Sequence, residues 1–198
     1  MRDELSVLLC RRYPRLYTQV REGVPTGAPA ENWCFDCADG WFDLIDALSE
    51  VVIQYVDVTD QLEVQASDVK EKHNELSFNV HGGDDYIDGA IWMAEIMSAV
   101  VCQICGTIDC TAHGRLPGLS PPKTVRFPDV HRPAWRRLVQ ALDVAVNLLI
   151  SRGAPEIVVE AVREGESLRF SWSGGNDEIA GCFSLVEAFS QRLGKEAP

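Results

Sequence analysis

The sequence predicts a mixed α+β fold made of two tandem helix–strand–strand–helix repeats, in which one antiparallel sheet, or two small ones, is covered by helices. Three observations predict it. Residues 76–98 resemble residues 168–190 at a constant offset of 92 positions. Stretches in which polar and apolar residues alternate indicate strands, and apolar residues with a period of 3.6 indicate helices on either side of them.

The internal match is the strongest of these observations. Nine of the 23 aligned positions are identical, where about one or two are expected by chance at ordinary residue frequencies. Both copies contain Gly-Gly-x-Asp-x-Ile-x-Gly, which amphipathicity does not dictate, so a duplicated unit explains the match better than coincidence does. The identical pairs are Leu76/Leu168, Phe78/Phe170, Gly82/Gly174, Gly83/Gly175, Asp85/Asp177, Ile87/Ile179, Gly89/Gly181, Glu95/Glu187 and Ser98/Ser190.

Each repeat is expected to open with a helix. A second match, at an offset of 94, aligns the apolar positions that follow Trp41 with those that follow Trp135. They recur with the spacing of one helix face, so each segment is predicted to bury a stripe of apolar side chains. The aligned pairs are Trp41/Trp135, Leu44/Leu138, Ile45/Val139 and Leu48/Leu142.

Two strands and a second helix complete each repeat. A Gly-Gly pair ends the second strand of each copy, and Asp84 or Asn176 then stands where the closing helix needs an N-cap. Polar residues, which are typical of turns, join the two strands. Alternation predicts the strands over residues 62–64 and 76–80 in the first copy, and over residues 157–162 and 168–172 in the second.

The remaining residues suggest four segments. Residues 1–33 are expected to form a short helix from Leu5 to Tyr17, broken by Pro14, and then a loop over residues 23–31 that is rich in glycine and proline. The other expected segments are a first repeat at 34–110, a proline-rich linker at 111–134 and a second repeat at 135–198.

The charge balance is strongly acidic. Thirty Asp and Glu residues face 18 Lys and Arg residues, and the formal net charge is −12. Nucleic acid and anionic membranes both need cationic neutralisation by the protein that binds them. The balance therefore makes binding to nucleic acid unlikely, opposes binding to a membrane, and suits a basic protein partner.

The apolar stretches are too short to cross a membrane. The longest, residues 141–150, is interrupted by Asp143 and Asn147, whereas a membrane span needs about 20 apolar residues. The N-terminus carries acidic residues where a secretory signal carries basic ones. We therefore expect a cytoplasmic protein.

The cysteine spacing predicts a structural zinc ion that staples the first repeat. Cys34 and Cys37 form one Cys-x-x-Cys pair just before its first helix, and Cys102 and Cys105 form another just after its last helix. Two such pairs can direct four thiolates at one tetrahedral ion. If helices and strands alternate in direction, the start of the first helix lies beside the end of the second, and both pairs meet at one pole.

A compact ligand set within a shorter segment is the alternative. Cys102 and Cys105 are followed by Cys110 and His113, with loop lengths similar to those of a zinc knuckle. Either set supplies four protein ligands and leaves no open coordination position, which makes the site structural rather than catalytic.

Motifs that would indicate catalysis are not found in the sequence. It contains no Gly-x-Ser-x-Gly, Walker loop, dinucleotide glycine fingerprint or His-Glu-x-x-His. His81-Gly-Gly-Asp84 has the composition of a metal site, but Gly-Gly recurs in the second repeat without the histidine. A strand end followed by a helix cap explains it better.

Residues 12–106 contain a series of short motifs: Arg12-Tyr-Pro-Arg-Leu-Tyr17, Trp33, Cys37-Ala-Asp-Gly-Trp-Phe-Asp-Leu-Ile-Asp46, Val69-Lys-Glu-Lys-His-Asn-Glu-Leu-Ser-Phe78, Ala94-Glu-x-x-Ser98 and Cys102-x-x-Cys-Gly106. In this order they resemble an uncharacterised family of bacterial and phage proteins, whose members read Cys-Gly-Asp-Gly-Trp, Lys-Glu-Lys-Phe-Gly-Gly-Leu-Arg-Phe and Cys-Glu-x-Cys-Gly. The family shows one cysteine before Gly-Trp, which matches Cys37, so the resemblance favours Cys110 or His113 over Cys34 as a ligand. The resemblance implies no known activity.

The function expected from these features is binding rather than catalysis. Small size, acidity and the lack of a catalytic motif favour a protein that neutralises a basic protein partner, such as an immunity protein, an antitoxin or a phage-encoded inhibitor of a host enzyme. A metal-dependent enzyme that uses clustered carboxylates and a zinc-containing module associated with nucleic acid are the alternatives. The expected partner-binding residues are acidic positions on and beyond the first helix: Asp43, Asp46, Glu50, Asp57 and Asp60.

Overall fold

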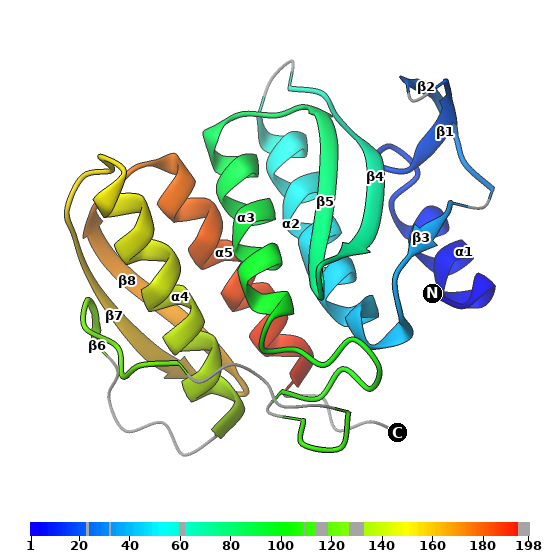
Figure 1. Ribbon diagram of the computed structural model, residues 1–198. Coiled ribbons are helices and arrows are strands. Elements are labelled where there is room, and N and C mark those ends of the chain that lie inside the picture. Colours follow the sequence, from blue (N-terminus) through cyan, green and yellow to red (C-terminus); the bar gives the residue numbers. More distant parts are fainter. Residues whose placement is uncertain are drawn as a thin grey trace.

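A computed structural model shows a mixed α+β protein (Figure 1). It describes residues 1–22, 24–31, 33–59, 62–108, 110–113, 119–126 and 133–193. Within these residues lie five α-helices and three small sheets. None of these helices combines the length and the apolar character that crossing a membrane requires.

The elements follow the predicted order, with short additions. The N-terminal part contains α1 (Asp3–Arg12), β1 (Thr18–Arg21) and β2 (Val24–Pro29). The first helix–strand–strand–helix segment contains β3 (Phe35–Asp36), the 3-10 helix η1 (Asp39–Trp41), α2 (Phe42–Val58), β4 (Val64–Lys72), β5 (Glu75–Gly82) and α3 (Asp85–Ser98). The second contains β6 (Val125–Arg126), α4 (Pro133–Ser151), β7 (Ile157–Glu164), β8 (Ser167–Gly174) and α5 (Asp177–Leu193).

The strands form separate small sheets. The hairpin β1-β2 is the first of the three. The second has the order β3-β4-β5 and the third β6-β7-β8, and in each of these two a strand of two residues runs parallel beside an antiparallel hairpin. Figure 1 shows the two sheets at opposite sides of the molecule, with helices between them. The parallel strands β3 and β6 are absent from the sequence prediction because two residues are too few to show alternation.

The N-terminal part differs from its prediction. Residues 23–31 are expected to be a loop, but Val24–Pro29 pairs with β1 in an antiparallel ladder that contains an irregular register. Proline and glycine make this segment look like a loop in the sequence, yet proline is tolerated in an edge strand because the missing N–H falls on the unpaired side. The predicted loop is therefore wrong.

The predicted helix caps are confirmed. The Asp84 side chain accepts a hydrogen bond from the backbone N–H of Ile87 at 3.2 Å, and Asn176 accepts one from Ile179 at 3.1 Å. Each cap satisfies a backbone donor that the first turn of a helix leaves without an intrahelical partner.

One hydrophobic core joins the two segments. Trp41 and Trp135 are each 1% exposed, and buried residues from all five helices belong to the same cluster. The indole Nε1 of Trp41 donates to the backbone oxygen of Val101 at 2.9 Å, which ties the start of α2 to the residues after α3.

The closest helix contact joins α3 to α5 through a reciprocal pair of glycines. A Cβ atom added at Gly89 would lie 1.9 Å from the backbone oxygen of Glu178, and one added at Gly181 would lie 2.0 Å from that of Tyr86. Positions 86 and 89 align with 178 and 181 in the sequence match. Each helix thus contacts the other through equivalent positions, as self-complementary interfaces do.

Helix side chains cover the outer edges of β5 and β8. In both segments a serine and a glutamate of the closing helix accept hydrogen bonds from backbone N–H groups of the edge strand. This contact explains why Glu-x-x-Ser occurs in both copies. The bonds join Leu76 to Ser98 at 2.8 Å, Phe78 to Glu95 at 3.2 Å, Leu168 to Ser190 at 2.9 Å and Phe170 to Glu187 at 2.8 Å.

Candidate metal centre

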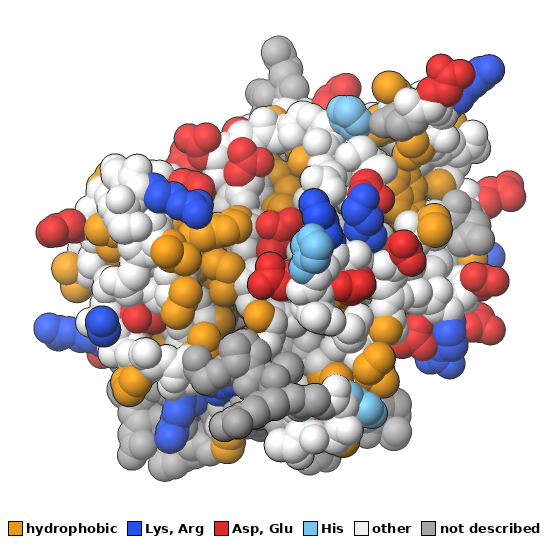
Figure 2. Space-filling model, in the orientation of Figure 1, with side chains coloured by type: hydrophobic (Ala, Val, Ile, Leu, Met, Phe, Trp, Pro, Cys, Tyr) orange, Lys and Arg blue, Asp and Glu red, His pale blue; other side chains and the backbone are white. Residues whose placement is uncertain are grey.

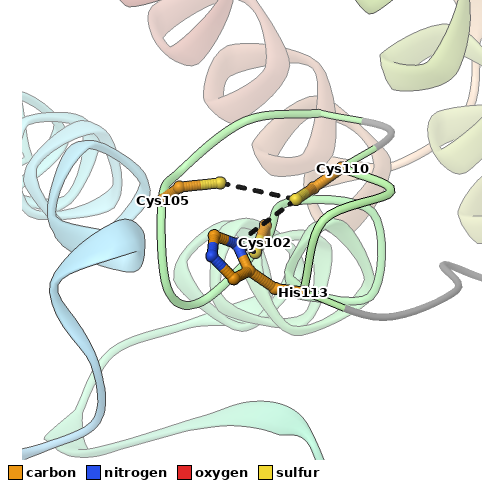
Figure 3. Close-up of side chains that lie close together, drawn as sticks. All are labelled: Cys102, Cys105, Cys110 and His113. Carbon is orange, nitrogen blue, oxygen red and sulfur yellow. Dashed lines mark hydrogen bonds between the residues drawn. The ribbon is translucent and has the colours of Figure 1, made fainter.

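Three cysteines and one histidine gather just after α3. The ligand atoms of Cys102, Cys105, Cys110 and His113 all lie within 4.8 Å of one another (Figure 3). Cys102 and Cys110 are buried, whereas Cys105 and His113 are exposed. The cluster therefore lies at the surface, with two ligands on its protein side and two toward solvent.

The distances within the cluster suit one tetrahedral ion. His113 Nδ1 lies 3.5 Å from the sulfur of Cys102 and 3.4 Å from that of Cys110, and the sulfurs of Cys105 and Cys110 are 3.5 Å apart. Ligand atoms around a tetrahedral zinc are about 3.5–3.8 Å apart, given zinc–ligand bonds of about 2.0–2.3 Å. The cluster is compatible with zinc without large rearrangement.

The chain folds locally to bring these ligands together. The backbone N–H of Gly106 donates to the oxygen of Cys102 at 2.8 Å, and that of Cys102 donates to Thr107 at 3.1 Å. A bridge between Val101 and Ile108 then turns the chain back, so that Cys110 reaches the first two cysteines. Backbone hydrogen bonds within this short segment therefore form the tight turn that gathers the ligands.

The thiol groups differ in their ease of ionisation. Hydrogen bonds from the hydroxyl and the backbone of Thr107 lower the pKa of Cys105 to about 6. Burial raises the pKa of Cys102, although backbone N–H groups of Cys105 and Ile104 partly oppose that rise. Thiolate is the form that binds a metal, so Cys105 is the thiol best prepared to begin binding.

The start of α2 packs directly on this turn. The backbone N–H of Gly40 donates to the oxygen of Gln103 at 2.8 Å, and a Cβ at Gly40 would lie 2.3 Å from the oxygen of Cys102. The expectation that the start of the first helix meets the end of the second is therefore confirmed. The glycine and tryptophan of the Asp-Gly-Trp motif make this contact, a role that spacing alone does not reveal.

The ligand set favoured by the two Cys-x-x-Cys pairs needs correction. Cys34 is exposed, Cys37 is buried, and neither belongs to the gathered group. Burial raises the pKa of Cys37 to about 11, which opposes the thiolate form. The compact alternative, with Cys110 and His113, is the set that the structure brings together, because its four ligands come from twelve consecutive residues.

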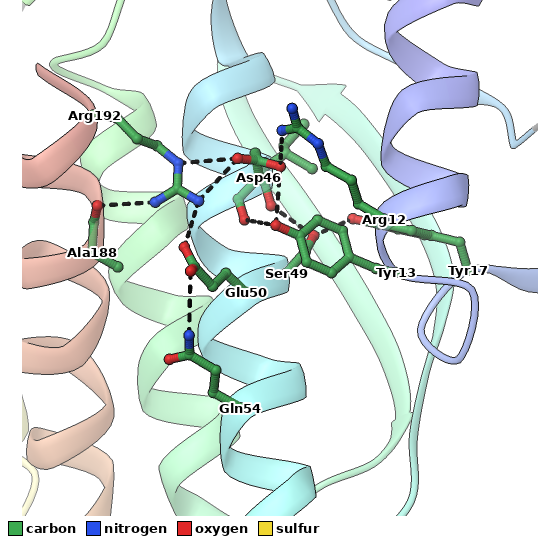
Figure 4. Close-up of polar contacts among 10 residues, drawn as sticks. Arg12, Tyr13, Tyr17, Asp46, Ser49, Glu50, Gln54, Ala188 and Arg192 are labelled. Carbon is green, nitrogen blue, oxygen red and sulfur yellow. Dashed lines mark hydrogen bonds and ion pairs between the residues drawn. The ribbon is translucent and has the colours of Figure 1, made fainter. Parts of the chain in front are cut away.

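The acidic residues expected to face a partner include a buried one. Asp46 is 6% exposed and accepts hydrogen bonds from Arg12 at 2.8 Å, from the Tyr13 hydroxyl at 3.0 Å and from Arg192 at 2.9 Å (Figure 4). Arg192 also pairs with Glu50 at 2.7 Å. This carboxylate joins α1, α2 and α5, so Asp46 is a structural residue and not part of an exposed acidic face.

The other residues of the expected face are dispersed. Glu50 is half-buried and already neutralised, and Asp57 is paired with Arg15 at 2.5 Å. Asp43 is exposed, whereas Asp60 lies outside the described residues. An acidic surface centred on α2 is therefore reduced to Asp43 and the partly paired Asp57.

Replacing Asp46 by asparagine is expected to lower the free energy of unfolding at neutral pH by about 3 kcal/mol, because Arg12 and Arg192 lose their shared carboxylate. Burial raises the pKa of Asp46, but hydrogen bonds from Arg12 and Arg192 outweigh it and hold this pKa below its ordinary value. The carboxylate thus stabilises the fold above its unfolded pKa of about 4, and this contribution is lost as pH falls through the lower folded value.

Urea unfolding at about pH 7 and about pH 3 measures both effects. The difference between wild type and Asp46→Asn should shrink at the lower pH, because the stabilising contribution of the carboxylate is lost progressively as pH falls below its unfolded pKa. Asp43→Asn, on the exposed side of the same helix, is the matched control and should change little at either pH. A wild-type advantage that is equal at both pH values would contradict this role of Asp46.

Comparisons with known proteins add no relative. No protein-family model, curated protein or solved structure matches the chain.

Proposed function

We propose that this chain is a non-catalytic, zinc-stabilised binding protein that neutralises a basic protein partner, in the manner of an immunity protein, an antitoxin or a phage-encoded inhibitor. The single observation that carries the proposal is the cluster of three cysteines and one histidine. Four protein ligands would occupy all four coordination positions of a tetrahedral zinc ion and leave none for substrate or water. The metal would therefore stabilise the fold rather than take part in a reaction.

The proposed zinc acts as a staple. It would join the end of α3 to the chain that leads toward α4, at the place where Gly40 packs on Gln103. A site of this kind contributes folding free energy directly. Three reduced thiols also suit a reducing compartment such as the cytoplasm.

The basic character of the partner is supported by charge. The net charge of −12 repels nucleic acid and anionic membranes and attracts a cationic surface. Carboxylates that remain exposed near the N-terminal ends of α3 and α5, at Asp85, Asp88 and Asp177, replace the face first expected on α2.

The two helix–strand–strand–helix segments are proposed to be copies of one unit. Support comes from their shared element order, from the reciprocal contacts of Gly89 and Gly181, and from the matched side-chain bonds to β5 and β8. A duplication leaves two similar surfaces, one of which is free to diverge for binding.

Two other functions receive less support. A metal-dependent hydrolase needs carboxylates around an ion with an open position, and the ligands that gather here are three thiols and an imidazole. A zinc module that binds nucleic acid would share this ligand set, but the net charge opposes it.

The partner should be a basic protein whose association slows with salt. A tagged chain, purified from its producing cells in reducing buffer without chelator, would retain the partner, and the two purified proteins would then be mixed by stopped flow. We expect the association rate to fall roughly tenfold between about 50 and 300 mM salt, because screening weakens electrostatic steering. Lysine at Asp85 and Asp88 should slow association further. A partner whose association ignores both salt and these substitutions would contradict the proposed role of the charge.

A further inference from the structure

An apolar face lies on the surface of α3 and α4. Trp92 and Ile96 stand one turn apart on α3, and Val144 and Leu148 stand one turn apart on α4. Leu148 is 41% exposed and the other three are half-buried. Figure 2 shows hydrophobic side chains gathered on this face of the molecule, over the two helices labelled in Figure 1.

The aligned positions elsewhere in the chain are polar. The helix pair α2 and α5 corresponds to α4 and α3 in the internal match, and a surface hollow of about 370 Å³ lies over it. Each apolar residue of the α3–α4 face aligns with a more polar or smaller residue beside that hollow. The aligned pairs are Val144/Glu50, Leu148/Gln54, Trp92/Ser184 and Ile96/Ala188.

This contrast shows whether apolar residues at these positions are needed for the helices to pack. Helices α2 and α5 are in contact although Glu50, Gln54 and Ser184 stand at these places, so contact between two such helices does not need apolar residues there. Exposed apolar side chains that gather on one face mark a surface that another molecule covers. Trp92 and Ile96 pack in part against the core, and their half-exposed sides together with Leu148 leave an apolar surface that contact between the two helices does not require.

Charge indicates what covers it. Helix α3 carries the exposed Asp85 and Asp88 and no Lys or Arg, so the apolar face has an acidic border on that side. The guanidinium of Arg152, just after α4, lies 5.0 Å from the ring centre of Trp92, so the acidic border is confined to the α3 side of the face. The net charge of −12 disfavours a second copy of the chain as the occupant.

We infer that the α3–α4 face binds an amphipathic helix of the basic partner, with its apolar side on Trp92 and Leu148 and its Lys or Arg residues beside Asp85 and Asp88. Helices commonly bind partners by laying apolar residues, spaced three or four apart, on a hydrophobic surface. The inference rests on the proposed function and names the surface and the segment that this function would use.

Two synthetic helical peptides test the inference. Both have about 18 residues, or five turns, with leucine at the helical period, and the other positions are lysine in one and glutamate in the other. Titration calorimetry would measure their binding to wild type and to the double variant Trp92→Ser, Leu148→Gln, which takes the residues of the aligned α2–α5 positions. Gln54→Leu at the aligned polar position is the control, and unfolding temperature and metal content verify each fold.

The leucine–lysine peptide should bind wild type and Gln54→Leu alike and bind the double variant at least tenfold more weakly. These substitutions leave the net charge unchanged, so non-specific attraction would give equal binding and would overturn the inference. Equal binding of the glutamate peptide would also overturn it. So would the finding that wild type is a dimer in solution and the double variant a monomer, since a second copy would then cover the face. If a native basic partner binds the double variant as tightly as wild type, the face is wrong while the proposed function stands. If no basic partner is found, the proposed function fails, and the peptide titrations alone decide whether the face binds a basic amphipathic helix.

Discussion

Replacing Cys110 with serine is expected to release the metal and to lower the free energy of unfolding by roughly 3–6 kcal/mol, because zinc binding free energy becomes folding free energy in such a site. For a chain of this size the unfolding temperature should fall by roughly 10 °C or more. Metal analysis of protein purified under reducing conditions should find about one zinc per chain in wild type. The variant should contain much less.

Cys34→Ser is the matched control, since it removes an exposed cysteine outside the cluster. It should keep both the zinc and the unfolding temperature of wild type. Cobalt substitution adds an independent measurement, because the absorption of a tetrahedral site with three thiolates should lose intensity in Cys110→Ser and not in Cys34→Ser. Zinc loss in Cys34→Ser would restore the ligand set favoured by the Cys-x-x-Cys pairs, and wild type without zinc would end the metal proposal.

Replacing Gly181 with alanine is expected to destabilise the protein by about 3 kcal/mol or more, although alanine favours helix formation. The added Cβ would lie 2.0 Å from the backbone oxygen of Tyr86, and no side-chain rotation can relieve a contact with backbone. Helices α3 and α5 would have to separate. Chemical unfolding followed by fluorescence measures the loss.

The reciprocal contact gives this prediction a second test. Gly89→Ala should cost a similar amount, and the double variant should cost less than the two single losses together, because one separation of the helices relieves both contacts. Gln191→Ala, at an exposed position of the same helix, is the control and should change stability little. Full additivity, or a neutral Gly181→Ala, would show that the helices do not cross as described.

The metal centre was only partly predictable from the sequence. Cysteine spacing identified the pole at which α2 and α3 meet, but two sets of four ligands were compatible with it. The choice depends on the turn formed by Gly106, Thr107 and the Val101–Ile108 bridge, which brings Cys110 back to Cys102. That turn is set by backbone hydrogen bonds, and side-chain spacing does not report them.

The helices and the second hairpin followed from periodicity, and the exceptions have physical causes. The first strand of the first hairpin was predicted at residues 62–64, but β4 covers Val64–Lys72, and an irregular register between Ala66 and Asp68 breaks its alternation of buried positions. Strands β3 and β6 are too short to alternate, and β2 contains proline and glycine. Asp46 illustrates a different limit, because an acidic residue on a helix looks the same in the sequence whether solvent or an arginine from position 192 lies beside it. The burial of its carboxylate depends on a contact between residues 146 positions apart.

The hydrogen bonds from β5 and β8 to helix side chains also limit how a partner can attach. Many proteins recognise one another by strand addition, in which an extended segment extends a sheet through free backbone N–H groups at its edge. Here the N–H groups of Leu76 and Phe78 are bound by Ser98 and Glu95, and those of Leu168 and Phe170 by Ser190 and Glu187. A partner could extend either sheet at these edges only by displacing two side chains of a packed helix. Recognition through the surface of the helices avoids that competition.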